Sequence, residues 1–153
     1  MCGIAGLVVA PGGAPPSPAL GQAMTAVIHH RGPDEGGLHH DDRALLGMRR
    51  LSIIDVAGSH QPIHSEDGQV CLVFNGEIYN FRALRAGLEA RGHCFRSHGD
   101  GEVVLQAYLR DGERCFEQFD GMFAIALWDR RTNTLLLARD RFGEKPLYYG
   151  HDN

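Results

Sequence analysis

The pattern of apolar and polar positions divides the chain into alternating strands and helices. Continuous β-rich apolar runs predict strands, whereas apolar residues that recur every three or four positions predict helices. The predicted strands cover residues 4–9, 44–55 and 69–77, a hairpin over 121–140, and a closing strand over 145–150. The predicted helices cover residues 19–30, 80–93 and 100–112, followed by a short helical turn over 113–121.

Turn and cap residues agree with these boundaries. Asn80 and Asp100 stand where helix N-caps are expected, and Gly92 and Gly112 stand at the predicted C-terminal ends. The proline-rich stretch 11–18 predicts a surface loop, and so does the stretch 29–37 on its own. Because the strands come in antiparallel-looking pairs with the helices grouped between them, we predict a single α+β layered domain.

Composition and charge narrow the classes of function. The chain has 153 residues, of which 43% are hydrophobic and 22% charged, as in an ordinary globular domain. Its formal charge of −4 argues against a nucleic-acid or membrane-surface partner. No apolar run approaches the ~18 to 20 residues of a membrane span, and no basic segment marks a secretory signal. We therefore expect a cytoplasmic protein.

The cysteines and histidines show no metal-binding spacing. The four cysteines stand at positions 2, 71, 94 and 115 without a CxxC motif, and Cys71 and Cys115 lie in apolar surroundings typical of buried thiols. The histidine doublets 29–30 and 39–40 lack the i, i+4 spacing that puts two ligands on one helical face. We predict no metal site, and the absence of a glycine-rich GKS or GKT loop gives no support to nucleotide binding.

Cys2 is the strongest candidate for chemistry. Its small side chain favours removal of the initiator methionine, which would leave a residue with both a thiol and a free α-amine. One residue would then supply a nucleophile and the base that activates it. A protein can also begin Met-Cys by chance, so this reading depends on the rest of the chain.

Three other segments each admit two interpretations. Asn75 and Gly76 form either a hairpin turn or a pair of donors to a developing oxyanion. Arg50, at the end of an apolar strand, either clamps a carboxylate or pairs with a surface acid. Asp100, at a helix start, either caps the helix or contacts a ligand.

Seven motifs occur in one order: MCGIAG, HRGPD, RLSIID, NGEIYN, GDGEV, GMFAIALWD and RDRFGEKPLYY. As an ordered set over nearly all of residues 2–150, they resemble the glutaminase domain of class II glutamine amidotransferases. The resemblance is greatest to glutamine-hydrolysing asparagine synthetases. It implies an N-terminal-nucleophile hydrolase fold, a four-layer α/β/β/α sandwich with two antiparallel sheets. It also implies hydrolysis of L-glutamine to glutamate and ammonia through a γ-glutamyl thioester on Cys2.

The resemblance also implies roles for individual residues. The family's oxyanion-hole residues match Asn75 and Gly76, and the arginine that holds the substrate α-carboxylate matches Arg50. The acid that takes the α-ammonium matches Asp100. Glu77 also lines that end, and the backbone of Ile53 makes further polar contacts to substrate. The chain departs from the family at His29, where arginine is common, and at Gly99, where serine is frequent.

The resemblance assigns residues 2–153 to a glutaminase domain and leaves the synthetase domain outside this chain. We expect no cofactor for the glutaminase domain, because ATP and Mg²⁺ belong to the synthetase domain. The expected partners are L-glutamine and an ammonia-accepting synthetase domain or subunit, docked on an apolar surface near the C-terminal segment. The alternative is a non-catalytic interaction or regulatory module that keeps the same fold.

Overall fold

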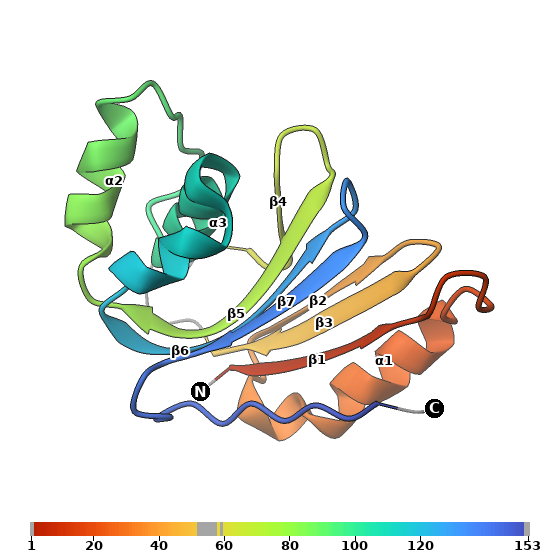
Figure 1. The fold of residues 1–153 in the computed structure, drawn as a ribbon. Helices are drawn as coiled ribbons and strands as arrows, with labels where there is room; N and C mark the ends of the chain where they lie inside the picture. Colours follow the sequence, from red (N-terminus) through yellow and green to blue (C-terminus); the bar gives the residue numbers. More distant parts are fainter. Residues whose placement is uncertain (1, 52–57, 59, 152–153) are drawn as a thin grey trace.

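Two antiparallel sheets lie face to face in the computed structural model, which describes residues 2–51, 58 and 60–151 (Figure 1). The first sheet has the order β1-β3-β2, with β1 (Gly3–Val8), β2 (Glu35–His40) and β3 (Ala44–Arg50). The second has the order β4-β5-β6-β7, with β4 (Ile63–His64), β5 (Val70–Ile78), β6 (Gly121–Asp129) and β7 (Thr134–Arg139). The antiparallel strand pairs confirm the α+β prediction.

Helices cover the outer face of each sheet (Figure 1). Helix α1 (Pro18–Val27) packs on the first sheet and is followed by the short 3-10 helix η1 (His29–Arg31). Helices α2 (Phe81–Glu89) and α3 (Asp100–Asp111) lie on the side of the second sheet, and the 3-10 helix η2 (Gly112–Gln118) follows α3. The order helix, sheet, sheet, helix confirms the predicted four layers.

Two apolar cores hold these layers together. The larger core lies between the second sheet and its helices and includes Phe74, Leu88 and Phe119. The smaller core lies between the two sheets and includes Met48 and Trp128. Complete burial of side chains of this size contributes about 1.5–3 kcal/mol each, so the sheets are joined by packing rather than by a shared strand.

The alternation of side chains along β5 determines where polar groups can enter the gap between the sheets. Val70, Leu72, Phe74 and Ile78 belong to the core under the helices, whereas Cys71 and Val73 belong to the core between the sheets. Because successive side chains on a strand point to opposite faces, Asn75 and Glu77 continue the face that looks toward the first sheet.

Some helix boundaries and caps differ from the predictions. Helix α1 ends at Val27 rather than near His30. Asn80 precedes α2 but does not cap it, because its side chain binds the backbone of Gln118 and Asp120 at 2.8 and 3.1 Å. The N-cap of α3 is Gly99, so Asp100 is its first helical residue and its carboxylate is directed elsewhere.

Three strand predictions were incomplete or wrong. The stretch 29–37, predicted as a loop, contains η1 and the start of β2, and the two-residue strand β4 was not predicted. Residues 145–150 form no strand, and both Tyr148 and Tyr149 are exposed. The predicted strand 44–55 ends at Arg50 within the described residues.

Among the helices that the structure describes, none is long and apolar enough to cross a membrane.

Candidate active site

A cavity of about 120 Å³ opens at one end of the gap between the two sheets. Every predicted site residue within the described part of the chain lines it: Cys2, Arg50, Asn75, Gly76, Glu77 and Asp100. These residues come from the start of β1, the end of β3, the second half of β5 and the start of α3. Ile53 lies outside the described residues.

Strand pairing places Cys2 at the cavity. Gly3 is the register partner of Arg49 in the β1–β3 ladder, so Cys2 lies alongside the end of β3. The backbone N–H of Leu51 donates to the Cys2 sulfur over 3.4 Å, and the thiol lies 3.7 Å from the Leu51 carbonyl oxygen. The N–H is therefore placed to stabilise negative charge on the sulfur.

The HRGPD motif supports this end of β1. The Arg31 guanidinium donates to the Cys2 carbonyl oxygen over 3.4 Å. A Cβ atom on Gly32 would lie 2.4 Å from the carbonyl carbon of Arg49, so only glycine lets this segment pass so close to β3. Gly32 thus allows Arg31 to reach Cys2.

Arg50 is buried and oriented by an acid. Its side chain is 5% exposed, and Nη1 forms a 3.2 Å ion pair with Oε2 of Glu35. The other carboxylate oxygen of Glu35 lies 2.7 Å from Nδ1 of His60. Arg50 thus pairs with an acid, as one interpretation predicted, and it also lines the cavity, whereas its clamping of a ligand carboxylate stays a prediction.

Asn75 and Gly76 lie inside β5 and not in a hairpin turn. They pair with Ala124 and Phe123 of β6, which rules out the turn interpretation. A Cβ atom on Gly76 would lie 2.1 Å from the Met122 carbonyl oxygen. Glycine is required here for the close approach of β6, with no need for a turn.

The backbone N–H of Gly76 faces the free edge of β5. In an antiparallel ladder, residues two apart direct their N–H groups to the same edge. The N–H of Phe74 donates to Oε1 of Gln61 over 2.7 Å, and that of Ile78 donates to Oδ2 of Asp100 over 2.9 Å. Gly76 lies midway between them, so its N–H points to this edge, away from β6 and beside the cavity.

Asp100 and Glu102 have different environments although both begin α3. Burial raises the pKa of Asp100 above its ordinary value, which the backbone N–H of Ile78 partly offsets. Glu102 accepts hydrogen bonds from the backbone of Arg96 and from the backbone and hydroxyl of Ser97. Glu102 holds the preceding loop, whereas Asp100 lines the cavity.

The sequence analysis missed two further polar lining residues, Gln61 and Lys145. The Gln61 amide pairs with both the N–H and the C=O of Phe74, at 2.7 and 3.0 Å, as a neighbouring strand would. The Asp140 carboxylate accepts the backbone N–H of Lys145 over 3.0 Å and holds this buried lysine at the cavity. The RDRFGEK motif was the available signal for Lys145.

Comparison with known proteins agrees with this arrangement. The family profile described as a glutamine amidotransferase domain matches residues 1–153. Asparagine synthetase [glutamine-hydrolyzing] 1 of Bacillus subtilis (strain 168) is 47% identical over 126 residues, which are 82% of this chain and 20% of the relative. Asparagine synthetase [glutamine-hydrolyzing] 2 of the same organism is 40% identical over 151 residues, covering 97% of this chain and 20% of the relative.

A solved structure shows the same fold. It is the glutamine phosphoribosylpyrophosphate amidotransferase of B. subtilis, with a TM-score of 0.54 and 21% identity, covering 66% of this chain and 24% of that one. The chain spans about a fifth of the length of the two Bacillus asparagine synthetases. Because the family profile matches the whole chain, the protein belongs to the glutamine amidotransferase domain family.

Proposed function

We propose that this chain hydrolyses L-glutamine to glutamate and ammonia, with Cys2 as the nucleophile. The observation that carries the proposal is the cavity itself. It brings together a thiol, the two candidate oxyanion donors Asn75 and Gly76, and the opposite charges of Arg50 and Asp100. The names of the two Bacillus relatives, glutamine-hydrolysing synthetases, support glutamine as the substrate.

Removal of Met1 would free the α-amine of Cys2 to act as the base. The thiol loses its proton to the amine, and the sulfur attacks the side-chain amide carbon of glutamine. The amine returns the proton to the leaving nitrogen, and ammonia departs from a γ-glutamyl thioester. Water then attacks the thioester carbonyl carbon, releases glutamate and restores the thiol. Arg31 and Leu51 act as positioning residues, since each contacts Cys2 and neither is assigned a bond-making step.

The amide oxygen of glutamine becomes negative when the tetrahedral intermediate forms. We assign the side-chain amide of Asn75 and the N–H of Gly76 to that oxygen, because Asn75 faces the gap beside Cys2 and the Gly76 N–H faces the cavity edge. Preorganised donors act at the transition state, and each contributes about 2.7–4 kcal/mol to lowering the barrier.

The charged groups would fix the far end of glutamine. Arg50 is suited to the α-carboxylate because a guanidinium donates two parallel hydrogen bonds in a fixed plane. Asp100 is suited to the α-ammonium, since one of its oxygens accepts from Ile78 and the carboxylate lines the cavity. Glu77 lies at the same end, and a backbone contact from Ile53 stays a prediction. Holding both charged groups at this end aligns the amide at the other end with Cys2.

The ammonia acceptor is assigned from the relatives' names. We propose that a synthetase domain or subunit consumes the ammonia and that ATP and Mg²⁺ bind there, with no cofactor in the glutaminase domain. The predictions of a cytoplasmic location and of no nucleic-acid or membrane partner stay predictions.

The proposal is tested by glutamate release from L-glutamine. We expect Cys2→Ala to abolish release and Cys94→Ser to leave it unchanged, because Cys94 is exposed and does not line the cavity. Release by Cys2→Ala at the wild-type rate would contradict the proposal. A correctly processed wild-type chain that binds glutamine without hydrolysing it would favour the non-catalytic module.

A further inference from the structure

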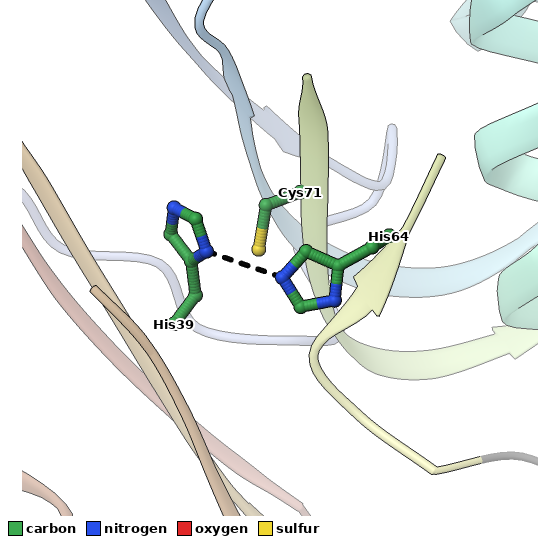
Figure 2. Close-up of side chains that lie close together, drawn as sticks. All are labelled: His39, His64 and Cys71. Carbon is green, nitrogen blue, oxygen red and sulfur yellow. Dashed lines mark hydrogen bonds between the residues drawn. The ribbon is translucent and has the colours of Figure 1, made fainter. Parts of the chain in front are cut away.

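A second cluster of reactive side chains lies away from the cavity, where His39, His64 and Cys71 meet (Figure 2). Nδ1 of His39 is 3.1 Å from Nε2 of His64. The nitrogen and sulfur atoms that the three residues offer all lie within 4.8 Å of one another. None of the three lines the candidate active site.

Strand register explains why three distant residues converge. His64 of β4 and Cys71 of β5 are direct partners across their ladder, so their side chains share one face of the second sheet. Cys71 belongs to the core between the sheets. His39 of β2 is the partner of Leu46, which belongs to the same core. All three side chains therefore point into the gap, two from one sheet and one from the other.

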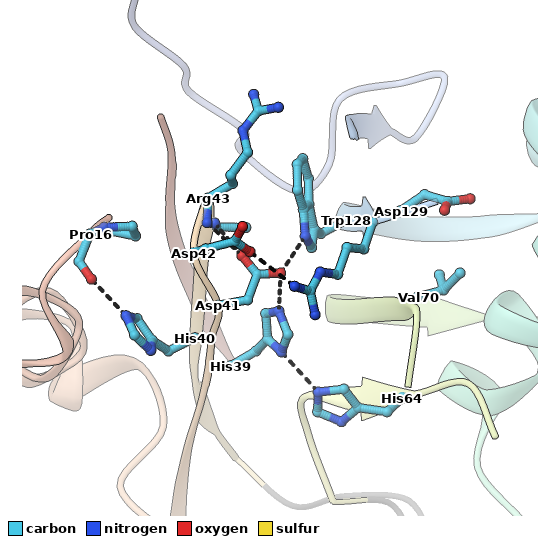
Figure 3. Close-up of polar contacts among 12 residues, drawn as sticks. Pro16, His39, His40, Asp41, Asp42, Arg43, His64, Val70, Trp128 and Asp129 are labelled. Atoms are coloured by element: carbon cyan, nitrogen blue, oxygen red, sulfur yellow. Dashed lines mark hydrogen bonds and ion pairs between the residues drawn. The ribbon is translucent and has the colours of Figure 1, made fainter. Parts of the chain in front are cut away.

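A partly buried carboxylate, that of Asp41, stands behind His39. The Nε2 atom of His39 lies 3.4 Å from Oδ2 of Asp41 (Figure 3). Asp41 is fixed by the N–H groups of Arg43 and Ala44, at 2.8 and 2.7 Å, and by the Trp128 indole N–H at 2.8 Å. A carboxylate beside one nitrogen keeps the proton on that nitrogen and leaves the other as a lone-pair donor. The Asp41 contact, which is an ion-pair distance and not a hydrogen bond, favours the tautomer whose Nδ1 lone pair faces His64 and Cys71.

We propose that His39, His64 and Cys71 form a zinc site, with His39 Nδ1, His64 Nε2 and Cys71 Sγ as ligands and a solvent molecule in the fourth position. A two-nitrogen, one-sulfur donor set is one that Zn²⁺ binds. When Zn²⁺ binds, the proton of His64 moves from Nε2 to Nδ1, so both imidazoles stay neutral, and the Cys71 thiol releases its proton to solvent. The exposed His64 leaves an open side for the fourth ligand.

The distances fit a tetrahedral ion after a small adjustment. Zn–N bonds of about 2.0–2.1 Å and Zn–S bonds of about 2.3 Å place the ligand atoms roughly 3.3–3.8 Å apart. The imidazole pair is already that close, so the widest separation must shrink by about an ångström. His64 stands on an exposed two-residue edge strand, where its ring can turn to close it.

Metal binding is measured in the Cys2→Ser protein, because an N-terminal thiol beside an amine itself chelates metal. Co²⁺ serves as the spectroscopic probe, since Zn²⁺ is silent. We expect Co²⁺ to give a thiolate-to-metal charge-transfer band that Zn²⁺ removes and that Cys71→Ser abolishes. Cys94→Ser is the matched cysteine control and should keep the band.

The histidines are tested by competition for Zn²⁺ against a chelator of known affinity. Loss of a group that only supports a metal ligand weakens metal binding ~10- to 100-fold. Because His39 and His64 are proposed as ligands themselves, His39→Gln and His64→Gln should each weaken zinc binding by at least that factor. His40→Gln is the matched control, because His40 adjoins His39 but contacts the Pro16 carbonyl oxygen on the other side of the strand, at 2.6 Å. It should bind zinc as the parent does.

The outcomes separate a metal site from a hydrogen-bonded pair. Bound Co²⁺ without a charge-transfer band, or equal zinc affinity in His64→Gln and the parent, would overturn the proposal. If Cys71→Ser does not fold, the exposed His64→Gln decides the question alone. Zinc should also raise the melting temperature of the parent, as any ligand specific to the folded state does, and should raise that of His64→Gln less at the same zinc concentration.

Discussion

Asp100 combines burial with a charge that glutamine binding would need. Its Ile78 hydrogen bond survives in Asp100→Asn, because an amide carbonyl oxygen also accepts an N–H. Loss of the charged contact to the α-ammonium should raise the KM for glutamine about 10- to 100-fold, the equivalent of ~1.5–3 kcal/mol. Steady-state kinetics check this, with the circular dichroism spectrum as the folding control. An unchanged KM would contradict the role assigned to Asp100.

The same substitution, Asp100→Asn, should impair glutamine binding without lowering the stability of the folded protein. Because burial raises the pKa of Asp100, the folded protein binds its proton more tightly than the unfolded chain. The buried charge therefore costs stability at neutral pH, and the cost is relieved as the pH falls through the raised pKa. Asp100→Asn should be at least as stable as wild type at pH 7, with the difference shrinking in acid. Urea unfolding at both pH values measures it; a variant that is less stable at pH 7 would contradict this reasoning.

Asn75 should act on the chemical step and not on binding. Its side chain is 5% exposed, in the cavity beside the candidate nucleophile. Asn75→Ala should lower kcat about 100- to 1,000-fold, because one oxyanion donor is lost. The KM should change little, since the developing charge exists only after attack. A normal kcat with a raised KM would instead assign Asn75 to substrate binding.

At the scale of single residues, the ordered motifs were enough to point to six of the residues that line the cavity. They were not enough to predict Glu35, Gln61 or Lys145, which support or line the site through contacts across the fold. The cluster of His39, His64 and Cys71 was missed for a related reason. Metal-ligand spacing on a helix is visible in local sequence, whereas these three residues come from three strands whose register is not.

At the scale of elements, the segment after β7 is held by one carboxylate. Asp140 accepts backbone N–H groups from four residues: Phe123, Phe142, Glu144 and Lys145. Burial would raise the pKa of Asp140, but these hydrogen bonds outweigh it and hold the pKa below its ordinary value. The stability they contribute is therefore present above the unfolded-state pKa and is lost as the pH falls through the folded-state pKa.

Asp140→Ala should lower the free energy of unfolding by about 2–3 kcal/mol at pH 7, because it leaves buried N–H groups without their acceptor. The loss relative to wild type should diminish in acid. Asp42→Ala is the control, since Asp42 forms only an exposed ion pair with Arg130 and should cost less than ~1 kcal/mol. Equal losses in urea unfolding for the two variants would contradict the role of Asp140.

Regular elements were predicted from the sequence where the apolar period was long, as in β5, β6 and α3. Prediction failed where tertiary contacts decide the structure. Strand β2 carries two glycines and few apolar residues, so its pairing with β3 determines its conformation. The stretch 145–150 has strand-like composition, but Tyr148, Tyr149 and Gly150 are exposed, and the backbone N–H of the buried Lys145 donates to Asp140 and not to a strand.

At the scale of the whole molecule, one face of β5 serves two sites. Asn75 and Glu77 line the cavity, and Cys71 lies in the proposed zinc site on the same face. Asn75 lies four positions after Cys71, which is about 13 Å along a strand. A metal at Cys71 would therefore join the two sheets without touching substrate. We expect Cys71→Ser to leave the KM for glutamine unchanged in a folded protein.

The central claim is that Cys2, with its amine free, is the nucleophile of a glutaminase site. The most direct test is the intact mass before and after treatment with 6-diazo-5-oxo-norleucine, a glutamine analogue that alkylates such a thiol. We expect loss of Met1 and a single adduct that maps to Cys2, prevented by excess L-glutamine. A processed chain that stays unmodified, or an adduct on Cys71, Cys94 or Cys115 instead, would contradict it.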